Sequence, residues 1–538
     1  MNATLRRSVA LAFPVIASVS LLAALGACNS SSQSDDDKLQ NKVSTIVVIY
    51  AENRSFDNLY GLFPGANGIP GVNPTATGTI APQLDRNAAG TMLAKLPQTW
   101  GGVTAGGQPV VVTQAQTDNL PNKPFPIEAT YAGVTKGIVT RDLYHRFFEN
   151  QMQVNGGAND KFAGWADSGG LVMGYYDGSS MALWTIAKQF VLADNFFQAV
   201  YGGSFLNHQY LICACAPEYP NADTATAAPT IATLDTDAAG KFLPRLTLAA
   251  SAPASALDGP PTYVRSGNIA PKNYFGDGTF RAVNTMQPAY QPSGNAPPAT
   301  DTTGRLANPG AANALPPQTQ ATIGDKLSAK GINWKWYAGA WAKASSDRTV
   351  IYNNTVPNFQ AHHHPFNYYA IMDPVAKAAD RAAHLKDYND FVADVAAGSL
   401  PPVTFYKPEG DLNQHPGYAG VAQGDAHIAD VITKLQASPQ WNNMVIIVTY
   451  DENGGFWDHV APPKGDLLGP STRLPAIIVS PFAKKGTVDH TQYDTASILR
   501  LITRRFGLEV LPGLTARDNA LKANGAQPMG DLTNALDL

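Results

Sequence analysis

VVIYAEN at residues 47–53 and IIVTYDEN at residues 446–453 are two apolar segments, each of which runs directly into acidic and amide side chains. Short runs of this kind are typical of strands that are buried on both faces, as in parallel sheets covered by helices. In parallel α/β sheets, ligands bind at the carboxyl ends of the strands. We therefore expect a parallel sheet in which these two polar strand ends lie close together.

The two strand ends carry a set of side chains with oxygen donors, which consists of Glu52, Asn53, Asp451 and Glu452. Three carboxylates and an amide carbonyl suit a hard or borderline divalent ion, whose charge would offset their mutual repulsion. At a single strand end, such acids are more often helix caps or solvated turn residues. The repetition at two ends favours a site for a divalent metal ion, whose identity the sequence leaves open.

Other segments extend this pattern to an α/β fold. Apolar runs at residues 43–50, 444–450 and 475–479 predict strands, and apolar residues at helical spacing predict helices over residues 428–435 and 498–506. Strands that alternate with amphipathic helices indicate a largely parallel sheet.

The composition describes a folded protein with one long irregular segment. The chain has 538 residues, of which 44% are hydrophobic and 15% are charged, as in globular proteins. A net charge of -4 gives no basic field, so nucleic-acid binding is not expected. Residues 217–303 are rich in Ala, Pro, Thr and Gly and lack strong periodicity, which predicts an irregular excursion within a single domain over residues 43–538.

The N-terminus predicts export. A basic start is followed by an apolar stretch at residues 9–25 and by small residues before Cys28, as in a signal peptide. The sequence LGAC at residues 25–28 resembles the lipobox of bacterial lipoproteins, in which the signal is cut before a cysteine that carries lipid.

This resemblance implies a signal peptide over residues 1–27, a lipid on Cys28 and a polar tether over residues 28–42. Asn29, rather than Asp, follows the cysteine, which points to the outer membrane, with the protein on its periplasmic or cell-surface face. Membrane attachment is therefore expected to be through the lipid.

The two remaining cysteines, Cys213 and Cys215, lie one residue apart in an apolar run. A bridge between them would be strained, and a free cysteine behaves as a small apolar residue. We expect buried thiols here, and the core rather than disulfides must hold the fold.

A serine follows paired glycines in GGSFLNH at residues 202–208. Glycines allow a tight turn, and a serine at the start of a helix meets the positive end of the helix dipole, which would stabilise both an alkoxide and an incoming phosphate. Taken alone, Ser204 is more often a helix N-cap than a nucleophile. Because Leu206 occupies the last position of a Gly-x-Ser-x-Gly pattern, a lipase-type elbow is disfavoured.

Histidine is scarce, and three of the ten histidines are consecutive at residues 362–364. Metal binding and phosphate binding compete as explanations, but the carboxylate set already supplies a metal site, and cationic imidazoles are good donors to phosphate. His145, His415 and His459 are further candidates, although each alone is more often a structural histidine.

Together, six motifs resemble the bacterial acid phosphatases that share a superfamily with phosphatidylcholine-type phospholipases C. The similarity covers nearly the whole mature chain, and its motifs are ENRSFD at 52–57, DKF at 160–162, GGLVMGYYD at 169–177, ADNFF at 193–197, GGSFLNH at 202–208 and DENGGFWDHV at 451–460.

This resemblance implies an α/β/α sandwich like that of alkaline phosphatases, with one metal ion that also touches the nucleophile, Ser204. The implied metal ligands are Glu52, Asn53, Ser204, Asp451 and Glu452. The implied substrate-site histidines are His145, His362, His363 and His415, with His364 at a variable position before Pro-Phe. Serine at the nucleophile position, instead of the threonine typical of the phospholipase C branch, favours the phosphatase branch.

We expect a metal-dependent acid phosphatase that hydrolyses small phosphorylated substrates through a phosphoserine on Ser204, with His415 protonating the leaving oxygen. Histidines that must be cationic to bind phosphate predict an optimum on the acid side of neutral. A phospholipase C or other phosphodiesterase is the alternative enzyme. A lipoprotein that binds phosphorylated compounds without turnover is the alternative from another class.

Overall fold

The computed structural model describes residues 34–538. The predicted signal peptide, Cys28 and the first part of the predicted tether lie outside these residues. The prediction of a tether is wrong for residues 35–42, because Asp35–Lys42 form helix α1. Ser34 and Asp37 close a capping box at its start, and Leu39 is fully buried, so burial of one apolar residue and a good cap order this polar segment.

The largest sheet has the strand order β12-β4-β11-β10-β1-β9-β7-β8, and β13 also pairs with β4. Its strands are β1 Thr45–Ala51, β4 Val191–Phe197, β7 Trp334–Ala338, β8 Leu385–Asp387, β9 Val403–Lys407, β10 Met444–Tyr450, β11 Arg473–Val479, β12 Thr487–Asp489 and β13 Tyr493–Asp494. Strand β1 is parallel to both β10 and β9, whereas β11 is antiparallel to both of its neighbours. The predicted, largely parallel sheet is confirmed.

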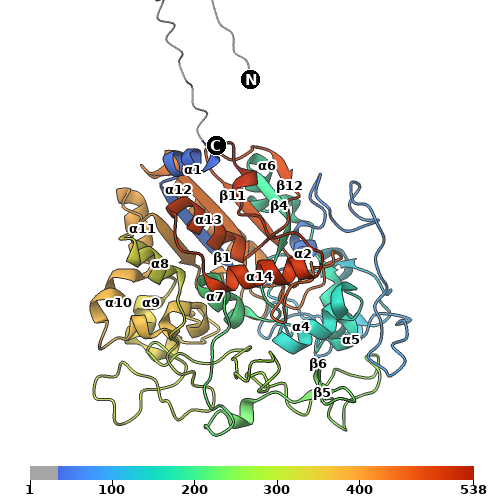
Figure 1. Ribbon diagram of the computed structural model, residues 1–538. Helices are drawn as coiled ribbons and strands as arrows, with labels where there is room; N and C mark the ends of the chain where they lie inside the picture. The colour runs from blue at the N-terminus through green and yellow to red at the C-terminus, as the bar shows by residue number, and fades with distance from the viewer. Residues whose placement is uncertain (1–33) are drawn as a thin grey trace, which may run out of the picture.

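Two groups of helices cover this sheet, and α13 lies in front of it in the view of Figure 1. In the first group, α12 contacts both α6 and α11; in the second group, α13 contacts α1 and α7, and α7 contacts α8. The described helices are α1, α2 Phe56–Tyr60, α3 Ile127–Thr130, α4 Phe147–Val154, α5 Phe162–Trp165, α6 Ala182–Gln189, α7 Ser204–Cys213, α8 Ile323–Ala329, α9 Trp341–Ser346, α10 Ala378–His384, α11 Tyr388–Ala397, α12 Val421–Ala437, α13 Ala496–Phe506 and α14 Pro512–Ala523. This is the predicted α/β/α sandwich, and α12 and α13 contain both predicted helices.

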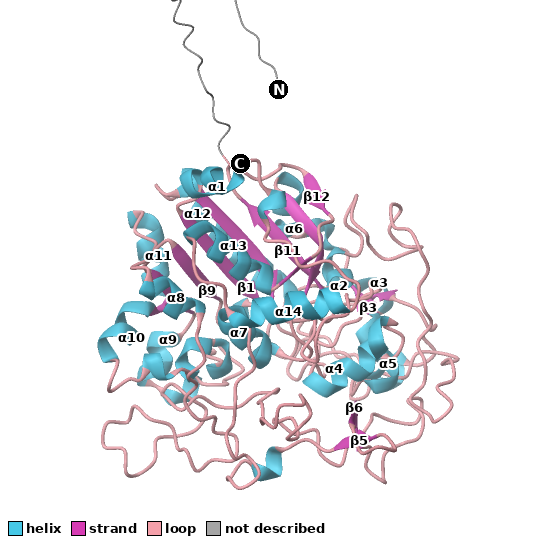
Figure 2. Cartoon of the chain, in the orientation of Figure 1, coloured by secondary structure: helices cyan, strands magenta, loops and turns pink. Residues whose placement is uncertain are grey.

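The segment predicted to be an irregular excursion, residues 217–303, is mostly loop and lies along the lower edge of the molecule in Figure 2. Its extended part is the hairpin of β5 Leu234–Thr236 and β6 Phe242–Leu246. Buried side chains such as Ile269 and Val283 belong to the same hydrophobic cluster as the sheet. The excursion is therefore packed onto the main body. Two further short strands, β2 Phe125–Pro126 and β3 Gly174–Tyr175, pair with each other elsewhere.

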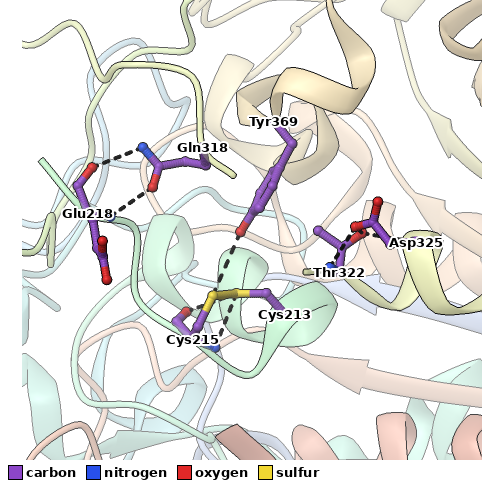
Figure 3. Close-up of a disulfide and its surroundings, with 7 residues drawn as sticks. All are labelled: Cys213, Cys215, Glu218, Gln318, Thr322, Asp325 and Tyr369. Carbon is purple, nitrogen blue, oxygen red and sulfur yellow. Dashed lines mark hydrogen bonds between the residues drawn. A yellow bond between two sulfur atoms is a disulfide. The ribbon is translucent and has the colours of Figure 1, made fainter. Parts of the chain in front are cut away.

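Cys213 and Cys215 form a disulfide, so the prediction of two buried thiols is wrong. Helix α7 ends at Cys213, and Ala214 adopts a left-handed conformation with φ of 50°. This turn brings the two Cα atoms to 5.1 Å, within the range that a disulfide spans. Figure 3 shows the hydroxyl of Tyr369 pointing at the bridge, 4.0 Å from Cys215 Sγ.

Among the described residues, no helix has the length and apolar character needed to cross a bilayer.

Candidate active site

The two polar strand ends lie side by side at one edge of the sheet. The register of β1 and β10 pairs Ala51 with Tyr450, so the next residue of each strand is an acid. The backbone N–H of Asn53 donates to Asp451 Oδ1 over 3.0 Å, and Glu452 is fully buried beside them. The structure thus brings the predicted metal-binding acids together from positions about 400 residues apart.

Tight turns after the two strands pack directly on each other. Asn53 has φ of 61° and Gly454 has φ of 60°, a left-handed conformation that asparagine tolerates and glycine favours. A Cβ at Gly454 would lie 2.3 Å from the carbonyl oxygen of Asn53, so no larger residue fits. The hydroxyl of Ser55 ties the turns together, because it donates to Trp457 O over 2.7 Å and accepts from the N–H of Asn58 at the start of α2.

Buried oxygen atoms without hydrogen-bond partners mark this edge as a cation site. Asp451 Oδ2 and Glu452 Oε1 have no partner in the described structure, and such atoms are costly to bury. Burial, reinforced by the charge of Asp451, raises the pKa of Glu52 and of Glu452 well above the usual range. A divalent cation would satisfy these oxygens and restore the ionised carboxylates. The chemistry of the donor set therefore fits the predicted metal ion.

Ser204 is the first residue of α7, and its hydroxyl faces the carboxylates. Ser204 Oγ lies 3.2 Å from Glu52 Oε2 and 3.4 Å from Asn53 Oδ1. The N-cap position belongs to Gly203, so the alternative in which Ser204 serves as the N-cap is wrong. A serine hydroxyl at a helix start, beside metal-binding groups, is placed to act as a nucleophile.

Ser204 opens into a cavity of about 310 Å³. The cavity is lined by His145, His362 and His415, and Asn284 of the excursion forms part of its wall. His145 Nε2 lies 3.3 Å from Asn53 Nδ2 and 3.6 Å from Glu452 Oε1. Three predicted substrate-site histidines therefore share one cavity with the predicted nucleophile.

The other histidines are placed differently. His363 does not line this cavity; its Nε2 lies 3.2 Å from Glu52 Oε1, and its ring stacks on His208. His364 packs against Trp341, with ring centroids 4.2 Å apart. His459 does not line the cavity either, and its Nδ1 lies 2.7 Å from Asp57 Oδ2.

Burial disfavours the cationic form of two of the cavity histidines, His362 and His415. It lowers the pKa of His362 to about 3 and lowers the pKa of His415 well below its usual range. The expectation that these groups are already cationic at mildly acid pH is therefore not supported for the ligand-free protein. A phosphate anion beside them would favour the charged form.

Two residues with direct contacts to the carboxylates were missed in the sequence. His208 Nδ1 lies 3.8 Å from Asp451 Oδ2, and its Nε2 lies 3.9 Å from Glu52 Oε1. The sequence feature that could have identified His208 is its spacing of four residues from Ser204, which puts both side chains on one helix face. The ammonium of Lys407 forms an ion pair with Glu52 Oε1. Lys407 ends β9, a third parallel strand next to β1, and the apolar run before it was the signal for this strand end.

Three buried residues could hold a metal ion together: Glu52, His208 and Asp451. One possible ligand atom of each lies within 4.8 Å of the other two. His208 is therefore an additional candidate ligand, beside the predicted oxygen donors. The identity and number of ions are left open by this geometry.

Comparison with known proteins agrees with this chemistry, because residues 43–509 match the Phosphoesterase family. The chain belongs to this family. Curated relatives include "Phospholipase C B" of Mycobacterium tuberculosis strain H37Rv, which is 23% identical over 535 residues and aligns with 92% of this chain and 78% of its own length. "Non-hemolytic phospholipase C" of Pseudomonas aeruginosa is 27% identical over 41% of this chain and 33% of its own length. "Non-specific phospholipase C6" of Arabidopsis thaliana is 35% identical over 22% of this chain and 28% of its own length.

This phosphoesterase is a hydrolase that acts on phosphoric esters. Similar solved structures include an alkaline phosphatase superfamily protein from Vibrio parahaemolyticus, with a TM-score of 0.22 and 14% identity over 40% of this chain and 50% of that one. Murine ectonucleotide pyrophosphatase/phosphodiesterase 5 has a TM-score of 0.26 and 10% identity over 62% of this chain and 91% of that one. At these TM-scores, the fold assignment rests on the chain's own sheet and helices.

Proposed function

We propose that the chain hydrolyses phosphoric esters through a covalent phosphoserine on Ser204. The observation that carries this proposal is the position of Ser204, whose Oγ lies 3.2 Å from Glu52 Oε2 and which lines the same cavity as His145, His362 and His415. A divalent cation held by Glu52, Asn53, Asp451 and Glu452 would lower the pKa of the serine hydroxyl and offset negative charge on the phosphoryl group.

In the first step, Ser204 Oγ passes its proton to the ionised Glu52 carboxylate, whose Oε2 lies 3.2 Å away, and bonds to phosphorus as the bond from phosphorus to the leaving oxygen breaks. His415 is the proposed proton donor to that oxygen. Burial lowers the pKa of His415, so the imidazole acquires its proton when the anionic substrate lies beside it. Water then attacks phosphorus and gives a proton to His415, while the bond from phosphorus to Ser204 Oγ breaks and Glu52 returns its proton to that oxygen.

The geometry favours phosphomonoesters as substrates. Three imidazoles line the cavity, which suits the three free oxygens of a terminal phosphoryl group. Serine at the nucleophile position is also the feature that resembles the acid phosphatases. The names of the curated relatives favour a second candidate, a phospholipase C that cleaves a lipid phosphodiester.

One assay separates these substrate classes. The purified chain, loaded in turn with different divalent ions, is given a chromogenic phosphomonoester and phosphatidylcholine vesicles in parallel. We expect faster release from the monoester. Faster release of phosphocholine would assign the phospholipase C activity, and absence of turnover on both substrates, with phosphate still bound, would support a binding protein.

We also propose that lipid on Cys28 tethers the enzyme to the outer membrane, a proposal that rests on the LGAC sequence at residues 25–28. Cys28→Ser should release the protein from the membrane fraction and leave turnover unchanged. Mass determination of the wild-type N-terminus checks processing, because an unlipidated, uncut N-terminus would contradict the anchor.

A further inference from the structure

The two oxygen atoms of the Glu52 carboxylate face different groups. Oε2 faces the hydroxyl of Ser204. Oε1 faces nitrogen atoms: the ammonium of Lys407, His363 Nε2 at 3.2 Å and His208 Nε2 at 3.9 Å. The carboxylate therefore has one side toward the reacting hydroxyl and one side that is held by the protein.

Lys407 is fixed in this place by its surroundings. It is 1% exposed, and its Nζ also donates to the carbonyl oxygen of Tyr50 over 3.0 Å. A buried ammonium requires such partners, because an unpaired charge in the interior is strongly unfavourable. The lysine does not line the cavity at Ser204, so it acts on the site through Glu52.

Lys407 supplies one positive charge beside the three carboxylates. Glu52, Asp451 and Glu452 bring three negative charges when ionised, and a divalent cation cancels two of them. Within residues 34–538, Lys407 is the sole lysine or arginine that forms an ion pair with any of these three carboxylates.

We propose that Lys407 is an electrostatic positioning residue, whose buried ammonium cancels the third carboxylate charge so that the metal-loaded site accepts an anionic phosphoryl group. This inference rests on the proposed function. Loss of the ammonium makes the site more negative. We therefore expect the affinity for anions to fall, whereas the affinity for a divalent cation should not fall. A lysine that served folding alone would weaken both together.

The test uses the full chain and measures binding, not turnover. Lys407→Met and Lys407→Arg are titrated with Mn²⁺ alone after metal removal, and the Mn²⁺-saturated proteins are then titrated with orthovanadate and inorganic phosphate by calorimetry. Lys335→Met is the matched control, since Lys335 lies on the adjacent strand β7 and pairs with Asp394 outside the site. Circular dichroism checks that each variant is folded.

We expect the Kd for vanadate and phosphate to rise at least about tenfold in Lys407→Met, with the Kd for Mn²⁺ no weaker than in the wild type. Lys407→Arg, which keeps the charge, should bind both anions within about threefold of the wild type, as should the control. Unchanged anion binding in Lys407→Met, or parallel loss of Mn²⁺ and anion binding, would overturn the proposal.

A charge-balanced double variant covers the case in which Lys407→Met does not fold. Glu52→Gln with Lys407→Met removes the buried pair together and leaves no unpaired charge. At Mn²⁺ saturation its phosphate Kd should return to within about threefold of the wild type, and a persistent tenfold loss would contradict the electrostatic role. These are binding measurements, so failure of the phosphoserine mechanism would be seen separately, as missing phosphate on Ser204.

Discussion

Ser204 Oγ lies 3.2 Å from Glu52 Oε2, although 152 residues separate the two positions. The contact joins the start of α7 to the end of β1, so the positive end of a helix dipole and a cluster of carboxylates meet at one hydroxyl. Charge developing on the Ser204 hydroxyl would therefore be stabilised by the helix start and by a cation that the carboxylates hold.

Glu452→Gln should weaken metal binding and stabilise the metal-free protein. Glu452 Oε1 is buried and accepts no hydrogen bond within residues 34–538, and the nearby charge of Asp451 adds to the cost of ionising it. We expect divalent affinity to fall at least about tenfold, while the metal-free variant gains about 1 to 2 kcal/mol in free energy of unfolding. Calorimetric metal titration and urea unfolding after chelation measure the two effects.

Glu128→Gln, which alters a partly exposed ion pair with Lys136, is the control for this experiment. Full metal affinity in Glu452→Gln would remove Glu452 from the ligand set.

Loss of the disulfide should cost little stability. The bridge closes a loop of only three residues, for which the chain-entropy model gives about 1 to 2 kcal/mol. Cys213→Ser with Cys215→Ser should therefore fold, keep turnover and become insensitive to a reducing agent in urea unfolding. Loss of activity in a folded double variant would show that the bridge shapes α7 as far as Ser204.

His427 should make the protein less stable in acid. Burial lowers its pKa from 6.5 to about 4, so between these values the unfolded state binds more protons than the folded state. The contribution of His427 to the free energy of unfolding therefore increases with pH in this range. As pH falls from 6.5 to about 4, the contribution decreases by up to about 1.4 kcal/mol per pH unit.

His427→Gln keeps a polar partner for Tyr406, whose hydroxyl lies 2.7 Å from His427 Nε2. Its unfolding free energy, measured in urea at several pH values, should show a shallower slope below pH 6.5 and no change of slope above pH 7. Identical slopes in both proteins would refute the assignment.

The sheet and the meeting of its polar ends could be predicted because both depend on local patterns. VVIYAEN and IIVTYDEN each combine a buried strand with its terminal acids, and parallel pairing then brings the ends together. The grouping of Ser204 with three histidines came from resemblance to known motifs. Periodicity alone could not place residues from a helix start and three other separate segments in one cavity.

The remaining features depend on tertiary packing. Lys407 is the last residue of β9, a strand that was not predicted from the sequence, and its proximity to Glu52 follows from the pairing of β9 with β1. The disulfide requires the left-handed turn at Ala214, a conformation that alanine rarely adopts and that no propensity indicates. The low pKa of His362 arises from burial, which cannot be read from three adjacent histidines.

The most direct test of the account is to find where the phosphoryl group is held during turnover. Wild-type enzyme loaded with a divalent ion is mixed with a phosphomonoester, quenched in acid and digested, and the peptides are sequenced by mass spectrometry. The account predicts phosphate on Ser204, and predicts that Ser204→Ala binds inorganic phosphate but loses turnover by about three orders of magnitude or more. Phosphate on a histidine, or near-normal turnover in the alanine variant, would contradict it.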